Sequence, residues 1–358
     1  MINNESLLAG FRMPAEWEKQ DSTLIAWPHN KTDWPDRFNN IPQIFAKIIT
    51  HISRVQKVCL LIQNKSDKPK VLKTIKKFKA TTKNIFITIK KTDRVWTRDS
   101  GPIYLINKTK TKKIISNWKF NAWAKYKNYR NDNSINAKII KLKKIKYTNP
   151  RYKKKNKVNN VVLEGGAIDV NGLGCLLTTK ECLLSKIQER NLGYKKRDME
   201  NIFKTYLGVK KIIWLNKGIE GDDTHGHIDD VARFISKNEI FLAYEKNKKD
   251  KNFKVLKENY KILNKSSDQN NKKLKIIKIP MPRPLYIDNV RVPASYLNFY
   301  IANKIVLVPI FNDPNDQKVL KIFKKYFKKR KIVPIDCTDL IWGFGAIHCM
   351  TQQEPALN

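Results

Sequence analysis

Apolar positions along the chain follow two spacings, which predict alternating helices and strands. Between residues 41 and 52 apolar side chains recur at steps of three and four, which places them on one face of a helix over about 42–54. The next apolar run, 58–62, is continuous and predicts a strand buried on both faces. Helical spacing returns over 71–78, and a second strand is predicted over 85–89. This part of the chain therefore predicts an α/β fold.

The same alternation continues to the end of the chain. Helices are predicted over 199–207, 254–263 and 316–327, and a hairpin is predicted from 231–235 with 239–244. Further short apolar runs predict strands over 161–163, 175–177, 212–215, 276–279, 305–309 and 332–335. Mixed strand and helix units of similar size thus cover most of the sequence.

Polar residues suited to chemistry recur at a nearly constant interval, each after an apolar run. The step is about 60–65 residues, and the series comprises Asp99, Glu164, His227, Asn289 and Cys349. Five similar units that each give one loop to a common centre predict a closed five-module α/β propeller. No change of composition marks a linker, so we expect one catalytic domain over 1–358.

Lysine-rich segments and the overall charge are the most unusual features of the composition. Two stretches, 107–160 and 247–275, are rich in Lys and Asn, and we expect surface insertions there, as exposed loops or hairpin extensions. In total, 72 Lys and Arg against 32 Asp and Glu give a formal charge of +40. Because the excess is Lys rather than Arg and is spread along the chain, we expect weak adhesion to polyanions and no specific nucleic-acid partner.

The cysteines and the hydropathy of the chain indicate the cellular compartment of the protein and the partners that it can have. The five cysteines include no Cys-x-x-Cys pair, so neither a disulfide framework nor a zinc ribbon is indicated. No run of about 18 apolar residues is present, and residues 1–5 lack the basic and apolar parts of a signal peptide. We therefore expect a soluble, cytoplasmic protein without a membrane partner, and a homo-oligomer is compatible with the sequence.

Cys349 is the residue at which we expect the chemistry. It follows a loop that contains Gly343 and Gly345, where backbone can approach a ligand closely. A cysteine acts as a nucleophile as its thiolate, which requires a positive or hydrogen-bonding environment. The remaining cysteines are expected to be small buried residues of the core, namely Cys59, Cys175, Cys182 and Cys337.

His227 and Asp229 lie two residues apart, so an extended segment would point both side chains to one face. An imidazole there can transfer a proton near neutral pH while the carboxylate holds a cation. The rival interpretation is a metal site, because His225-Gly-His227 is similar to the start of metallo-hydrolase motifs. Asp230 replaces the final histidine of that pattern, so we expect no metal and no cofactor, and a structural role for His225.

Two further acids follow predicted strands. Asp99 comes after Trp96, whose flat face, together with a carboxylate, suits a planar cation; alternatively, Asp99 caps a turn. Glu164 follows the strand at 161–163, which we expect to pair with 175–177, and a carboxylate buried there is costly unless it is paired. One thiol, one imidazole and three acids at one centre favour a guanidinium substrate.

The motifs around these residues resemble the agmatine deiminase family, part of the guanidine-modifying superfamily that includes the peptidyl-arginine and arginine deiminases. The resemblance extends over nearly the whole chain, with matching motifs at 13–18, 27–30, 96–102, 163–166, 177–184, 226–229, 296–299 and 347–353. The loops at 343–346 and 221–225 depart from the commoner family pattern but leave the reacting groups intact.

This resemblance implies a five-module α/β propeller (pentein) fold and a hydrolase without metal or organic cofactor. It implies Cys349 as the nucleophile, His227 as general acid and base, and Asp99 and Asp229 as guanidinium ligands, with Glu164 as a further acidic contact of the substrate. A covalent thiouronium intermediate would form and then be hydrolysed. The implied reaction converts agmatine into N-carbamoylputrescine and ammonia, a step of putrescine biosynthesis.

Agmatine, free arginine and peptidyl arginine share the same reactive head, so an arginine or peptidyl-arginine deiminase is an alternative. The carboxylate of free arginine would need a basic partner, with candidates in Arg98, Arg283 and Arg291. The terminal amine of agmatine would prefer an acid, with candidates in Glu164, Asp222 and Asp288. The charge suggests a third hypothesis of another class, an inactive polyanion-binding protein that releases no ammonia from any guanidine.

Overall fold

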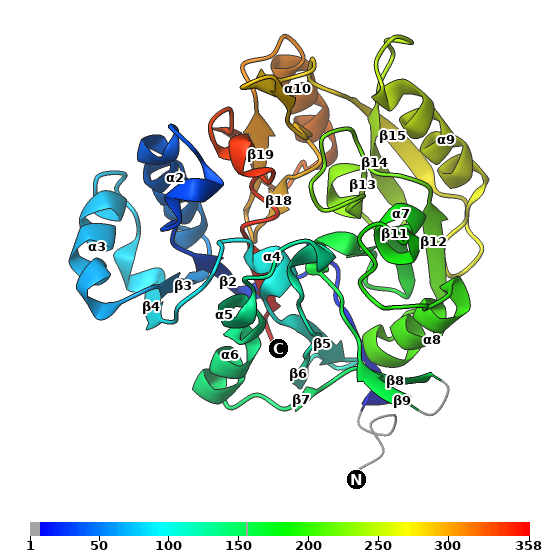
Figure 1. Ribbon diagram of the computed structural model, residues 1–358, viewed down its shortest axis with the longest axis horizontal. Coiled ribbons are helices and arrows are strands. Elements are labelled where there is room, and N and C mark those ends of the chain that lie inside the picture. The colour runs from blue at the N-terminus through cyan, green and yellow to red at the C-terminus, as the bar shows by residue number, and fades with distance from the viewer. Residues whose placement is uncertain (1–7, 155–156) are drawn as a thin grey trace.

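The strands of the protein form five separate sheets of three or four strands and two further hairpins, in a computed structural model that describes residues 8–154 and 157–358 (Figure 1). Residues 1–5, from which we inferred the absence of a signal peptide, lie outside the described residues. No sheet among the described strands closes on itself. Within the same ranges no helix combines the length and the apolarity needed to cross a membrane. The α/β prediction is thus confirmed.

The first sheet joins the two ends of the chain. Its strand order is β21-β2-β3-β4, with β21 antiparallel to β2 and the other neighbours parallel. The strands are β2 (Gln20–Ala26), β3 (Lys57–Ile62), β4 (Ile85–Ile89) and β21 (Gln352–Pro355), and the helices that follow β2 and β3 are α2 (Ile41–Ser53) and α3 (Lys68–Lys76). Because β21 comes directly after Cys349, this pairing fixes the position of the cysteine loop.

The second sheet has the order β1-β5-β6-β7 and carries the region that supplies Asp99. It consists of β1 (Phe11–Arg12), β5 (Ile103–Asn107), β6 (Lys113–Ser116) and β7 (Tyr147–Thr148), with the helices α4 (Thr97–Ser100), α5 (Arg130–Asn133) and α6 (Ile135–Lys143). The prediction of exposed loops over 107–160 was therefore wrong for most of that segment. Its Lys-rich helix α6 still buries Ile135 and Ile139, and only β8 (Arg151–Lys154) and β9 (Lys157–Asn160) form a hairpin extension.

The remaining three sheets have three strands each. They comprise β10 (Asp169–Val170), β11 (Cys175–Thr179) and β12 (Lys211–Leu215); β13 (Ala232–Phe234), β14 (Glu239–Tyr244) and β15 (Lys275–Pro280); and β18 (Tyr300–Ile301), β19 (Ile305–Ile310) and β20 (Lys331–Asp336). Their helices are α7 (Lys180–Leu184), α8 (Lys196–Leu207), α9 (Asn252–Lys265) and α10 (Asp316–Tyr326). A second hairpin consists of β16 (Tyr286–Ile287) and β17 (Val290–Arg291).

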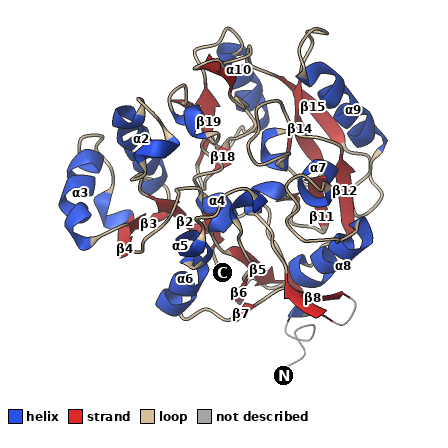
Figure 2. Cartoon of the chain, viewed as in Figure 1, coloured by secondary structure: helices blue, strands red, loops and turns tan. Residues whose placement is uncertain are grey.

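One arrangement recurs in all five sheets, although in the first sheet the antiparallel partner β21 comes from the C-terminal end of the chain. An antiparallel pair is followed by a helix and then by a strand parallel to the second member, as in β10-β11-α8-β12 and β18-β19-α10-β20. The parallel crossover needs a connection long enough to return over the sheet, which the helix supplies. In Figures 1 and 2 the helices α2, α3, α6, α8, α9 and α10 lie on the outside of the molecule, whereas α4 lies near the middle.

Two local predictions were wrong. The segment 161–163 forms no strand with 175–177: Val162 makes an isolated bridge to Lys119, and β11 pairs with β10 instead. Asn289 is exposed at positive φ (64°) in the turn between β16 and β17, so it cannot be the fourth member of the polar series. The structure brings Asn298 to the cysteine in its place.

Candidate active site

The chain reaches Cys349 through a tight turn and buries its side chain. The 3-10 helix Leu340–Gly343 ends where Phe344 adopts positive φ (61°). Gly345 then passes so close to Trp96 that a Cβ atom there would lie 2.7 Å from the indole ring. Cys349 is 5% exposed, and its sulfur lies 3.8 Å from Asp229 Oδ2. Burial, together with the carboxylates of Asp229 and Asp230, raises the pKa of the Cys349 thiol well above its ordinary value.

His227 stands between two groups of acids. Its Nδ1 atom is 3.8 Å from Asp99 Oδ1 and 4.0 Å from Asp229 Oδ1, while its Nε2 atom is 3.9 Å from Glu164 Oε2. The imidazole is fully buried. Burial alone would lower the pKa of His227, but Asp99 and its other close neighbours raise that pKa well above the ordinary value. A protonated imidazole is therefore available as an acid.

Asp99 is held by two neutral donors. Its Oδ2 accepts a bond of 2.9 Å from the indole N–H of Trp123, and its Oδ1 accepts one of 2.9 Å from the backbone of Gly166. A Cβ at Gly166 would lie 2.6 Å from His227 Nδ1 and 2.7 Å from Asp99 Oδ1, so the close approach requires glycine. Burial, with the nearby carboxylates of Asp229 and Glu164, raises the pKa of Asp99 to about 6.

Asp229 and Glu164 each use one oxygen and leave the other free. Asp229 Oδ2 lies 2.6 Å from Nδ1 of His348, whose Nε2 lies 2.8 Å from Glu16 Oε2. Glu164 Oε1 accepts a bond of 3.1 Å from Nε of Arg190, an ion pair with both side chains fully buried. Burial opposes ionisation of Glu164, yet Arg190 lowers its pKa to about 2, and contact with His348 lowers the pKa of Asp229 against the same opposing effect.

The atoms left without a partner face one another around His227. Among the buried side-chain atoms of the described residues, Glu164 Oε2, Asp229 Oδ1 and both ring nitrogens of His227 have no hydrogen bond. A buried unsatisfied polar atom costs about 1–3 kcal/mol, so the free carboxylate oxygens call for a ligand that donates hydrogen bonds to them. Acceptors on opposite sides of a proton donor suit a planar cation with several N–H groups.

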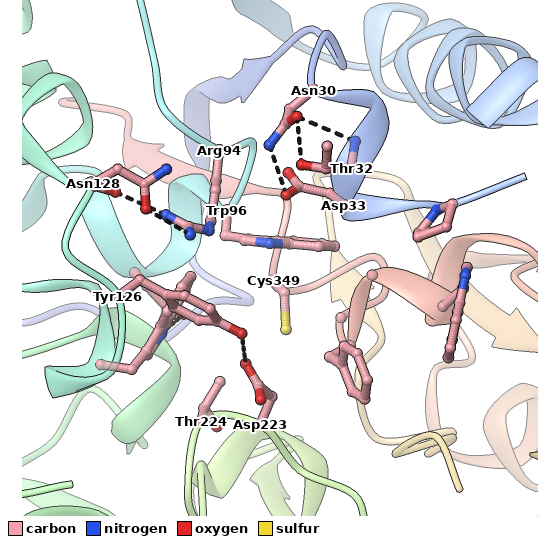
Figure 3. Close-up of a pocket in the computed structure, with 17 residues that line it drawn as sticks. Asn30, Thr32, Asp33, Arg94, Trp96, Tyr126, Asn128, Asp223, Thr224 and Cys349 are labelled. Carbon is pink, nitrogen blue, oxygen red and sulfur yellow. Dashed lines mark hydrogen bonds between the residues drawn. The ribbon is translucent and has the colours of Figure 1, made fainter. Parts of the chain in front are cut away.

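A cavity of about 290 Å³ leads to this centre, and the Cys349 sulfur points into it in Figure 3. Trp96, Asp99, Trp123 and Cys349 line it, whereas Glu164, His227 and Asp229 lie behind that lining. The structure thus brings three of the residues selected from the sequence, Trp96, Asp99 and Cys349, to one cavity. Glu164 faces His227 with its Oε2 atom and is not among the residues that line the cavity.

The other charged candidates from the sequence lie elsewhere. Arg98 is buried against Glu16, Arg283 pairs with Asp313 and Arg291 pairs with Asp250, so none lines the cavity. Asp222 accepts backbone bonds from Thr224, Gly226 and His227, and Asp288 is exposed at positive φ. The cavity instead carries charged side chains that the sequence analysis did not select, namely Asp33, Arg94 and Asp223.

The metal interpretation of the His225-Gly-His227 segment finds little geometric support. His225 turns away at positive φ, and its Nε2 lies 2.9 Å from Ser185 Oγ. Within the described ranges, the ligand atoms of Glu164, Cys182 and His227 come within 4.8 Å of one another, close enough for an ion. Cys182 otherwise packs into an apolar cluster, as expected for a core cysteine.

Comparison with known proteins places the chain among guanidine-modifying enzymes. The family model for Porphyromonas-type peptidyl-arginine deiminases matches residues 12–355. A Legionella pneumophila protein provisionally named agmatine deiminase is 34% identical, with 97% of this chain and 96% of that protein covered. The Enterococcus faecalis agmatine deiminase structure has a TM-score of 0.87 at 28% identity, covering 99% of both chains. A cysteine-to-serine variant of the C. jejuni agmatine deiminase with substrate bound has a TM-score of 0.84 at 30% identity, covering 96% of both. The chain therefore belongs to the Porphyromonas-type peptidyl-arginine deiminase family.

Proposed function

We propose that this protein is an agmatine deiminase that hydrolyses agmatine to N-carbamoylputrescine and ammonia. The observation that carries the proposal is the charge around Cys349. Five buried groups are counted here. With Asp99, Asp229 and Glu164 ionised and with His227 and Arg190 protonated, these five groups carry an excess of one negative charge. A guanidinium cation neutralises that excess and offers an N–H donor to the unsatisfied Asp229 Oδ1.

Cys349 is the proposed nucleophile. Its raised pKa keeps the empty site in the thiol form, and the entering cation offsets the carboxylates that raise it, so the thiol loses its proton to solvent. The thiolate then attacks the guanidinium carbon while Asp99 and Asp229 hold the group planar and charged. His227 donates its proton to one nitrogen, the carbon–nitrogen bond breaks, and ammonia leaves a thiouronium on Cys349. The bound substrate of the C. jejuni cysteine-to-serine variant supports a reacting cysteine in this family.

Hydrolysis completes the cycle. His227, now neutral, takes a proton from water, and the hydroxide adds to the thiouronium carbon. The carbon–sulfur bond breaks and the thiolate is regenerated, while the new hydroxyl loses its proton to solvent, so the carbon keeps a carbonyl oxygen in place of the lost nitrogen. Glu164, anchored by Arg190, acts in this scheme by orienting His227 through its Nε2 side.

The charged residues of the cavity favour agmatine over arginine. Three lining carboxylates, Asp33, Asp99 and Asp223, accompany one lining arginine. This arginine, Arg94, donates to the backbone and side-chain oxygens of Asn128 at 2.8 and 2.9 Å and stacks on Tyr126. Asp33 Oδ2 has no partner, and burial raises the pKa of Asp33 to about 6. A dication with an amine at its far end therefore suits this cavity better than an amino acid with a carboxylate there.

Ammonia release from agmatine, arginine and a blocked arginine peptide tests the function, with Cys349→Ala as the inactive control. We expect agmatine to be the preferred substrate by at least about tenfold in kcat/KM, because a hydrogen bond to a charged group contributes about 1.5–3 kcal/mol and a factor of ten corresponds to about 1.4 kcal/mol. Preferential turnover of the peptide would identify a peptidyl-arginine deiminase instead. Ammonia release undiminished in the alanine variant would contradict the mechanism.

A second variant tests the amine contact alone. Asp33→Asn should lower kcat/KM for agmatine by about tenfold relative to butylguanidine, which has the same head and no amine. Asp21→Asn, at an exposed pair with Lys57, serves as the control and should leave this ratio unchanged. An unchanged ratio in Asp33→Asn would show that Asp33 does not bind the amine of agmatine. The proposed reaction at the guanidinium would not be affected by that result.

We also propose the finer architecture expected from the sequence: five pseudo-symmetric modules in one catalytic domain over 1–358. The repeated strand and helix pattern supports it, and so does the origin of the central residues, with Asp99, Glu164, His227, Asn298 and Cys349 each coming from a different repeat. Single cooperative unfolding of the whole chain is expected, and two separate transitions would contradict the one-domain proposal.

A further inference from the structure

Three buried side chains behind the cavity lining offer a set of metal ligands that the proposed reaction does not use together. Glu164, Cys182 and His227 each present one ligand atom, and the three atoms lie within 4.8 Å of one another. We propose that these residues form an inhibitory binding site for a divalent cation of the zinc type, which takes His227 out of the reaction. The binding site is independent of the proposed function, whereas its effect on activity rests on that function.

Glu164 and His227 point unsatisfied atoms at each other. Among the described residues Glu164 Oε2 and His227 Nε2 have no hydrogen-bond partner, and they lie 3.9 Å apart. The guanidinium of the proposed reaction meets Asp229 on the Nδ1 side of the ring, so it leaves these two atoms unsatisfied. The side chains of Glu164, Cys182 and His227 are at most 1% exposed. A metal ion beside the thiol satisfies both atoms at once.

The separation of these atoms suits zinc. Zinc holds histidine nitrogen and carboxylate oxygen at about 2.0–2.2 Å, so two such ligands lie about 3.4 Å apart in a tetrahedral site. The 3.9 Å between Glu164 Oε2 and His227 Nε2 therefore requires a contraction of about half an ångström. Three protein ligands are the number found at zinc sites that leave one position open.

The neighbours of Glu164 and His227 hold both ligands in a suitable orientation. Arg190 donates to Glu164 Oε1 at 3.1 Å, which leaves Oε2 for an ion. On the far side of the imidazole, Nδ1 lies 3.8 Å from Asp99 Oδ1 and 4.0 Å from Asp229 Oδ1. A metal-bound histidine usually directs its other N–H at a carboxylate, and a ligating carboxylate usually accepts a further hydrogen bond. Both kinds of partner are present here.

A threonine fixes Cys182 relative to His227. Cys182 lies in the first turn of α7, and Thr179 Oγ1 accepts its backbone N–H at 3.1 Å. The same hydroxyl donates to the carbonyl of Gly226, the residue before His227, at 2.5 Å. The thiol and the imidazole are therefore brought together by the backbone of two loops.

Charge balance and ligand type both favour zinc. The ligands bind as thiolate and neutral imidazole, so one divalent cation replaces the protons of Cys182 and His227. Exchange of two protons for one ion of charge +2 leaves the charge of the buried group unchanged, which keeps the electrostatic cost of binding small. Thiolate and imidazole favour zinc over magnesium and calcium, which prefer oxygen ligands.

An ion on Nε2 removes the proton donor of the proposed reaction. The free imidazolium gives one proton to the substrate nitrogen and becomes neutral. With a metal on Nε2, the ring keeps only the proton on Nδ1, and loss of that proton would leave an imidazolate. Binding therefore stops the step in which ammonia leaves, although Asp99 and Cys349 still line the cavity.

Binding is measured without turnover in Cys349→Ser, which lacks the proposed nucleophile. Calorimetry with Zn²⁺ should show one site per chain, and Co²⁺ should give the sulfur-to-metal charge-transfer absorption of a thiolate ligand. Because the ligands are buried, protein and metal are incubated until the reading is constant. Adding Cys182→Ala should weaken binding at least about 100-fold and abolish the absorption. No such absorption in Cys349→Ser would overturn the proposal.

Cys175→Ala in the same background is the matched control. Cys175 is also completely buried, but it lies on β11 and outside the group of ligands. Its substitution should leave the Zn²⁺ affinity and the Co²⁺ absorption unchanged. Equal losses in both alanine variants would reveal a general effect of core substitution and overturn the assignment of Cys182.

X-ray absorption covers the case in which Cys182→Ala fails to fold. In Cys349→Ser loaded with Zn²⁺ we expect one sulfur at about 2.3 Å from the ion, beside nitrogen and oxygen. A shell of nitrogen and oxygen alone would overturn the proposal.

Inhibition is tested in wild type. Bound Zn²⁺ should lower ammonia release from agmatine at least about 100-fold, and a chelator should restore it. In Cys182→Ala about 100-fold more Zn²⁺ should be needed for the same relative inhibition. Equal sensitivity of the two proteins would overturn the inhibitory role. Failure of the proposed function is distinct, because metal-free wild type would then release no ammonia from agmatine.

Discussion

Two buried ionic clusters lie on either side of Asp229, and they differ in whether their charges balance. The back cluster comprises Glu16, Arg98, Asp169 and Arg233, two acids with two arginines. The front cluster comprises Asp99, Glu164, His227, Asp229 and Arg190, which together carry an excess of one acid. His348 joins the clusters, since it contacts Glu16 with one ring nitrogen and Asp229 with the other.

The balanced back cluster stabilises the fold, whereas the unbalanced front cluster is suited to binding a substrate. In the back cluster Arg233 lies 2.5 Å from Asp169 and 3.0 Å from Glu16, and Arg98 also contacts Gln352. Arg233 thus ties β13 to β10 and to the N-terminal segment, and Arg98 ties α4 to that segment and to β21. In the front cluster unsatisfied oxygens and nitrogens remain. Burying an uncompensated charge is costly, so the front cluster is less stable empty than occupied.

The largest expected effect comes from removing the sulfur while leaving both clusters intact. Cys349→Ser should lower kcat by at least about 10⁴-fold, because the hydroxyl is a far weaker nucleophile. Agmatine should still bind, since the carboxylates of the front cluster are unchanged. Steady-state ammonia release and calorimetric titration check the two expectations. Loss of binding together with turnover would mean that the front cluster alone does not hold the cation.

Substitution in the front cluster should affect activity more than stability. Asp99→Asn removes one guanidinium ligand, and we expect kcat/KM for agmatine to fall by about 10²–10³-fold. The pKa of Asp99 is raised to about 6, so folding opposes its ionisation at neutral pH, and the neutral amide relieves that cost. The melting temperature at pH 7 should therefore be no lower than that of wild type. A marked fall would show that Asp99 is chiefly structural.

Substitution in the back cluster should affect stability more than activity. Glu16→Gln leaves Arg98 and Arg233 buried with one acid fewer, and removing one partner of a buried ionic group costs about 3–5 kcal/mol. Burial opposes ionisation of Glu16, but Arg233 and His348 hold its pKa far below the ordinary value. Urea denaturation measures the loss. A variant as stable as wild type but inactive would assign Glu16 to catalysis instead.

Much of the fold was predictable because periodicity reports burial. The predicted helix over 42–54 is α2, the runs 58–62 and 85–89 are β3 and β4, and the C-terminal helix over 316–327 is α10. Strand β2 does not show this apolar periodicity, because several of its buried side chains are polar and form hydrogen bonds with other side chains. Ser22 bonds Glu354 at 2.7 Å, and Thr23 contacts the hydroxyl of Tyr300 at 2.9 Å. These partners are more than 270 residues away in sequence.

The candidate site was likewise predicted from the sequence only in part. The motifs pointed to Cys349, His227, Asp99 and Asp229, and the structure brings these four together. Asn298 was missed as a site residue because an asparagine that faces a sulfur leaves no local pattern. Its motif at 296–299 matched the family, and a spacing argument selected Asn289 instead. Which residues satisfy a buried group is decided by tertiary pairing, and spacing does not report it.

The smallest expected effect is the response to pH, which compares Asp99 of the front cluster with Glu16 of the back cluster. Asp99 must be ionised to hold the guanidinium, so kcat/KM should fall about tenfold per pH unit below pH 6. For stability the sign follows from the raised pKa of Asp99: its contribution is fully present below about pH 4 and is lost as pH rises to about 6. Glu16 acts oppositely, because its lowered pKa makes its contribution present above about pH 4.5 and lost only in strong acid, whereas burial raises the pKa of its neighbour Asp169 and gives that group the same sign as Asp99. Denaturation of wild type, Asp99→Asn and Glu16→Gln between pH 4 and 7 separates the two. If the decline of stability between pH 4 and 6 persists unchanged in Asp99→Asn, Asp99 is not its source, and another buried acid with a raised pKa, such as Asp33 or Asp132, must account for it.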